Sequence, residues 1–145
     1  MSRGPSPHLS WSELACRDGT PYPVIWRASR AVTLAATFEA VRALLGDHPI
    51  VILSGYRTEA YNATLEGAAS KSQHVQGRAL DIWHDALEPV TVFTMLRHAQ
   101  AQGFLPDLGG LGLYRSFVHV DVRPKPADGH LALWGGRGVT VPVLS

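Results

Sequence analysis

Residues 70–82 read SKSQHVQGRALDI and join a polar loop to an apolar strand. His74 lies in the polar part, and Asp81 lies inside the apolar run that ends at Ile82. A carboxylate in such a run must be paired, hydrogen-bonded or bound to a metal, because an isolated buried charge is costly. The group that compensates the charge of Asp81 therefore decides how the chain is arranged around this strand.

A second stretch, FVHVDVR (117–123), carries polar residues on one face of a strand. Side chains alternate along a strand, so the three valines share the core face, whereas His119 and Asp121 share the other face. The same alternation separates Asp81 from Leu80 and Ile82. If the two strands are neighbours, Asp81 and His119 point into one cleft, and His74 enters it from its loop.

The remaining pattern predicts two helices, at 30–45 and 88–104, each with one apolar stripe. The expected strands are 49–57, 77–83, a hairpin over 107–123 and a last strand over 139–144. Helices and strands alternate only partly. We therefore predict one α+β domain over 1–145, with a small antiparallel sheet, helices on one face and residues 1–9 as a loose arm.

Composition argues against several function classes. The 145 residues are 46% hydrophobic with a net charge of +1, so no basic stripe is available to follow nucleic acid. One cysteine, Cys16, cannot form a disulfide framework. No apolar run approaches the length of about 20 residues that a membrane span needs, and the start of the chain lacks the apolar region of a signal peptide. We expect synthesis in the cytoplasm.

Two histidines and one carboxylate form a common ligand set for catalytic zinc, which leaves a fourth position for water. The residues alone leave other readings open. Asp81 could pair with Arg57 or Arg78, and His119 could be a packed strand histidine. His84 is expected to be exposed, although it could be a rival ligand.

Three motifs carry a family resemblance. They are SGYR (54–57) followed by Asn62, SQHVQGRALD (72–81) and GLGLYRSFVHVDVR (110–123). In order and spacing, over about residues 10–123, they resemble the zinc D-Ala-D-Ala carboxypeptidases. These belong to the LAS metallopeptidases, which also include lysostaphin-like enzymes and the Hedgehog signalling domain. The resemblance implies a Hedgehog- or DD-peptidase-like fold with one zinc ion.

The resemblance also implies roles for individual residues. Arg57 would hold a substrate carboxylate or carbonyl, for which a planar guanidinium is well suited. Ser72 would hydrogen-bond the substrate, and Tyr114 is expected to form a cleft wall and to donate a hydrogen bond to the substrate. The implied zinc ligands are His74, Asp81 and His119.

The chain departs from the family at the general base. Many relatives have a carboxylate three residues before the last ligand, or a histidine two residues before it. Ser116 and Phe117 occupy these positions here, and neither accepts a proton at neutral pH. Asp121 is the candidate base because it shares the face of His119. It could equally orient a ligand histidine, or pair with Arg123.

These features predict a monomeric zinc peptidase that cuts the stem peptides of peptidoglycan, at D-Ala termini or at an internal bond such as L-Ala–D-Glu. Such a protein would act at the cell wall as a phage endolysin released through a holin, or as part of a phage particle. The alternative is a catalytically silent, metal-bearing module that binds the wall or builds the phage particle. A third hypothesis is a metal-free domain that binds DNA or protein.

Overall fold

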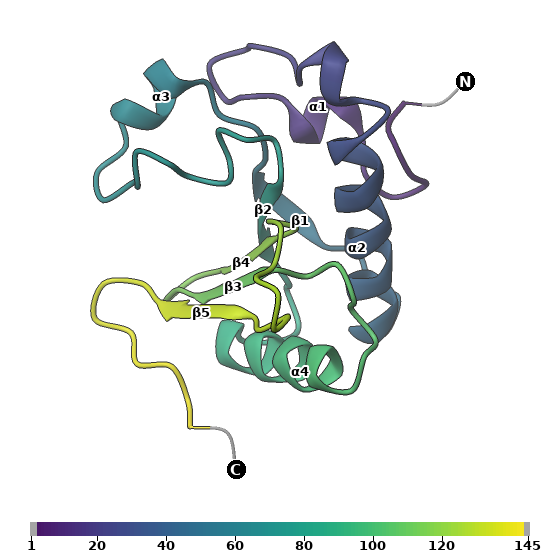
Figure 1. Ribbon diagram of the computed structural model, residues 1–145, viewed down its shortest axis with the longest axis vertical. Helices are drawn as coiled ribbons and strands as arrows, with labels where there is room; N and C mark the ends of the chain where they lie inside the picture. The colour runs from purple at the N-terminus through teal and green to yellow at the C-terminus, as the bar shows by residue number, and fades with distance from the viewer. Residues whose placement is uncertain (1–2, 144–145) are drawn as a thin grey trace.

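The computed structural model describes residues 3–143 and contains one five-stranded sheet with its helices (Figure 1). Residues 1–2 and 144–145 lie outside the described part. In chain order the elements are α1 (Trp11–Leu14), the 3-10 turn η1 (Val24–Trp26), α2 (Arg30–Leu44), β1 (Val51–Ser54), α3 (Glu59–Ala63), β2 (Ala79–Trp83), α4 (Pro89–Ala101), β3 (Gly110–Leu113), β4 (Val118–Asp121) and β5 (Ala132–Gly135).

The strand order β1-β2-β4-β3-β5 makes the two motif-bearing strands neighbours. β2 and β4 are antiparallel, and their register places Asp81 opposite His119. On the next strand, Gly112 lies opposite His119. The predicted juxtaposition of Asp81 and His119 is therefore confirmed.

The long helices α2 and α4 pack against the apolar face of the sheet and against each other, as Figure 1 shows. Alternation along β2 and β4 directs Leu80, Ile82, Val118 and Val120 into this core, where each is at most 2% exposed. The α+β class with helices on one face is confirmed. None of the helices among residues 3–143 is long and apolar enough to cross a membrane.

The sheet is mixed, whereas we expected an antiparallel one. β5 pairs with β3 in parallel register. β4 already lies between β2 and β3, so the chain that leaves β4 must pair at an outer edge. A strand that returns from β4 runs antiparallel to β4. Because β3 is also antiparallel to β4, the returning strand is parallel to β3 when the two pair.

The last strand also differs from the expected position. β5 spans Ala132–Gly135, and residues 139–143 of the expected strand 139–144 form no regular element. Pro142 lacks an N–H group, so this segment is a poor partner for a sheet ladder. Residue 144 lies outside the described part.

Residues 3–9 of the expected loose arm contact α2. The Ser6 hydroxyl donates to the Glu39 carboxylate at 2.6 Å, and the His8 backbone N–H donates to the same group at 2.9 Å. Leu9 is 1% exposed and belongs to the core. These contacts hold the described part of the arm on the domain.

Gly77 anchors the loop that joins His74 to Asp81. Its φ is 68°, and a Cβ there would lie 2.7 Å from the Trp26 ring. The Tyr22 hydroxyl donates to the Gly77 carbonyl at 2.7 Å. Only glycine combines this backbone conformation with this close approach.

We predict that Gly77→Ala lowers the free energy of unfolding by about 2–4 kcal/mol, because it adds overpacking against Trp26 to left-handed backbone strain. Gly103→Ala is the matched control, since Gly103 has φ 88° and open space around it. Urea denaturation measures both. Equal losses in the two variants would contradict the role of the Trp26 contact.

Candidate metal centre

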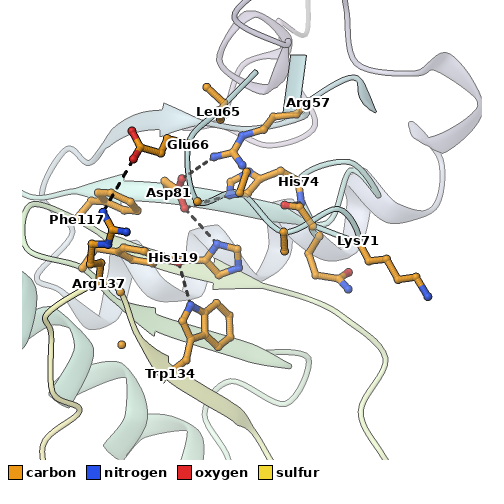
Figure 2. Close-up of a pocket in the computed structure, with 18 of the residues that line it drawn as sticks. Arg57, Leu65, Glu66, Lys71, His74, Asp81, Phe117, His119, Trp134 and Arg137 are labelled. Atoms are coloured by element: carbon orange, nitrogen blue, oxygen red, sulfur yellow. Dashed lines mark hydrogen bonds and ion pairs between the residues drawn. The ribbon is translucent and has the colours of Figure 1, made fainter. Parts of the chain in front are cut away.

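Three buried side chains converge on the polar face of the β2–β4 pair. His74 Nε2 lies 3.1 Å from Asp81 Oδ1, and His119 Nδ1 lies 3.2 Å from the same oxygen. The three residues are 2%, 5% and 6% exposed. Figure 2 shows both imidazoles directed at this carboxylate. The ligand atoms lie within 4.8 Å of one another, so the group could hold a metal ion.

The proton on the His74 ring is fixed by the backbone. Nδ1 lies 2.7 Å from the carbonyl oxygen of Gly55, which can only accept. Nδ1 therefore carries the hydrogen, and the neutral ring presents an unprotonated Nε2 to Asp81. Burial lowers the pKa of His74 and outweighs the opposing effect of Asp81, which favours this neutral form.

His119 is oriented in the same way by Asp121. Its Nε2 lies 2.7 Å from Asp121 Oδ2, so Nε2 donates and Nδ1 faces Asp81. Asp121 is 0% exposed and also accepts from the Arg123 guanidinium at 2.7 and 2.9 Å. Burial raises the pKa of Asp121, but hydrogen bonds from His119 and Arg123 outweigh it and lower the pKa to about 2.

When both rings are neutral, three acceptor atoms therefore lie close together: His74 Nε2, His119 Nδ1 and Asp81 Oδ1. Burial of Asp81 opposes its charge, yet its contacts with His119 and His74 hold the pKa of its carboxyl well below the usual value. In the metal-free protein a proton can stabilise the contact, since the hydrogen bonds of His119 raise its pKa against the effect of burial. A divalent cation satisfies all three lone pairs at once, and nitrogen and oxygen donors suit zinc.

Arg57 contacts the other oxygen of Asp81. Its Nη2 donates to Asp81 Oδ2 at 3.4 Å, its Nη1 to Asn62 Oδ1 at 3.2 Å and its Nε to Ser54 Oγ at 3.3 Å. The ion pair between Arg57 and Asp81 considered from sequence is therefore present. It leaves Asp81 Oδ1 directed at the histidines.

The centre opens into a cavity of about 660 Å³. One wall is the loop after α3, and Asn62 holds this loop through a 2.8 Å bond to the Ala69 carbonyl. The opposite wall comes from β5 and the turn after it (Figures 1 and 2). Besides the three converging residues, the lining includes Arg57, Glu66, Lys71, Ser72, Gln73, Tyr114, Phe117, Arg123, Trp134 and Arg137.

A family model described as Peptidase M15 matches residues 7–121. The chain belongs to the peptidase M15 family. The match covers the converging residues and Arg57, and ends at the last residue of β4. No curated protein matches the chain.

A second group in this M15 family member, formed by His48, His84 and Asp85, also has ligand atoms within 4.8 Å of one another. His84 is 7% exposed, whereas exposure to solvent was expected. Its Nδ1 accepts from the backbone N–H groups of Ala86 and Leu87 at 3.0 and 3.1 Å. The ring proton must then lie on Nε2, which makes His84 a poor metal ligand.

Ser72 and Tyr114, which the sequence predicts to contact the substrate, both line the cavity. Ser72 Oγ also accepts from the His74 backbone N–H at 3.2 Å and so helps to shape the ligand loop. The sequence did not predict the part of the cavity wall that Trp134 and Arg137 form. Their only sequence signal was a tryptophan before a Gly-Gly pair, which is too common to identify a site.

We predict that Asp121→Asn weakens zinc binding by about 10- to 100-fold, because the partner that orients His119 loses its charge. Zinc titration against a competing chelator measures the effect. The exposed Asp107 provides the control Asp107→Asn, which should bind zinc like the unmodified protein. Equal zinc affinity in Asp121→Asn would contradict this role of Asp121.

Proposed function

We propose that the protein is a zinc-dependent peptidase that hydrolyses stem peptides of peptidoglycan. The observation that carries this proposal is the buried His74–Asp81–His119 group at the floor of an open cavity, in a chain of the peptidase M15 family. His74 Nε2, His119 Nδ1 and Asp81 Oδ1 would hold the ion. When bound, zinc supplies Lewis acidity toward a peptide carbonyl and makes water more acidic.

Arg57 is suited to position the substrate. It lines the cavity, and a guanidinium has more N–H groups than its three bonds within the protein use. Those bonds fix its plane, so the remaining N–H groups are ready to meet a carbonyl or a carboxylate of the peptide. A D-Ala terminus supplies such a carboxylate.

Asp121 is better placed to orient His119 than to transfer a proton to the substrate. Its carboxylate is fully buried, accepts from His119 and Arg123, and is not among the residues that line the cavity. Of the two catalytic-site roles considered from sequence, the geometry therefore supports that of a positioning residue.

A second candidate function is a metal-bearing module that binds wall peptides without cutting them. It is favoured by Phe117, which places an apolar ring at one usual position of the general base. Phe117 lines the cavity and stacks on Tyr114, with the two ring centroids 4.5 Å apart. Such a module would bind peptides tightly and release no product.

We predict chelator-sensitive cleavage when the zinc-loaded protein is incubated with purified peptidoglycan of several wall types. Mass spectrometry of the released fragments identifies the bond. His74→Ala is the control, because it removes a ligand and should abolish cleavage. Absence of chelator-sensitive cleavage on every wall type would overturn the peptidase proposal, and peptide binding without turnover would support the module.

We also predict that Arg57→Lys raises KM about 10- to 100-fold, since an ammonium cannot reproduce the planar contacts of the guanidinium. Arg97→Lys is the charge-matched control, because Arg97 donates to the Pro142 carbonyl and does not line the cavity. Steady-state kinetics on a synthetic stem peptide measures both. An unchanged KM in Arg57→Lys contradicts a role in substrate binding.

A further inference from the structure

One wall of the cavity comes from a segment outside the family match. The match ends at residue 121, whereas Trp134, Gly135, Gly136 and Arg137 line the cavity from the opposite side to the ligand loop. We name residues 132–137 the C-terminal wall. The contribution of this wall to the cavity therefore comes from residues that the family model does not match.

The C-terminal wall is packed directly against the metal centre. The centroids of the Trp134 and His119 rings are 5.0 Å apart, and Trp134 Nε1–H donates to the Tyr114 hydroxyl at 3.0 Å. Two glycines make room for this pair. A Cβ on Gly112 would lie 2.6 Å from Trp134, and one on Gly136 would lie 2.3 Å from Tyr114.

The C-terminal wall also brings a positive charge to the mouth of the cavity. Arg137 Nη1 faces Glu66 Oε1 of the opposite loop at 4.0 Å, with side chains 95% and 94% exposed (Figure 2). An ion pair this long and exposed is weak and exchanges readily. The charged residues of the lining are mostly basic: Arg57, Lys71, Arg123 and Arg137 against Glu66 and Asp81.

We infer that the C-terminal wall is a specificity subsite for an acidic peptide. The peptide packs against Trp134 and Tyr114, and its carboxylate replaces Glu66 as the partner of Arg137. This carboxylate is distinct from the group that Arg57 meets on the floor of the cavity. The inference rests on the proposed function and adds that the preferred stem peptide carries a free acidic group beside the scissile bond.

The test uses two synthetic stem peptides that differ only in the glutamate α-carboxyl group, which is free in one and amidated in the other. Their Kd for the zinc-loaded protein is measured by calorimetry, and KM and kcat are measured by mass spectrometry. We expect the free acid to bind about two- to fivefold more tightly, the range of one exposed ion pair, with similar kcat.

Two single substitutions should move this preference in opposite directions. Arg137→Gln should remove it, and Glu66→Gln should increase it because Arg137 loses its competing partner. Arg115→Gln is the matched control, since Arg115 is exposed in the neighbouring turn and does not line the cavity. It should retain the preference of the unmodified protein.

Equal Kd values for the two peptides, or an unchanged preference in Arg137→Gln, would overturn the subsite. Failure of the proposed function would give a different result, because Kd is measured independently of cleavage. If neither peptide is cut but the free acid still binds more tightly through Arg137, the subsite stands and the peptidase proposal falls.

Discussion

The structure depends on one close contact, in which two imidazole nitrogens are directed at a single oxygen of Asp81. Each nitrogen is directed there by a partner behind its ring, the Gly55 carbonyl for His74 and the Asp121 carboxylate for His119. When both rings are neutral their lone pairs face the ionised carboxylate, so a second proton on His119 or a bound cation stabilises the contact. A divalent cation would turn the same geometry into a binding site and would compensate the charge of a carboxylate within an apolar strand.

The surrounding elements hold these donor and acceptor atoms in place. Antiparallel pairing of β2 and β4 sets Asp81 opposite His119, and Gly77 folds the ligand loop back onto Tyr22 and Trp26. Gly110 allows close packing behind the centre, since a Cβ there would lie 2.3 Å from the Asp121 carboxylate. Close packing of glycine against functional side chains therefore fixes the donor atoms before any ion binds.

The sequence predicts that His74, Asp81 and His119 come together, but it does not predict the wall that β5 and the turn after it form. Period-two alternation in 79–83 and 118–121 placed Asp81 and His119 on one face, because strand geometry alone determines that. The partner strand of β5 depends on which sheet edge is free, which is a property of the assembled topology. The parallel β5, and with it Trp134 and Arg137, could not be read from local pattern. The valine-rich run near Pro142 instead suggested a strand, but its described residues 139–143 form no regular element.

The most direct test is crystallographic. Anomalous diffraction at the zinc edge, on crystals of the zinc-loaded protein, locates the ion independently of any activity. We expect one strong peak within about 2.0–2.2 Å of His74 Nε2, His119 Nδ1 and a carboxylate oxygen of Asp81. A peak at His48, His84 and Asp85 instead, or no peak between the three converging residues, would contradict the account.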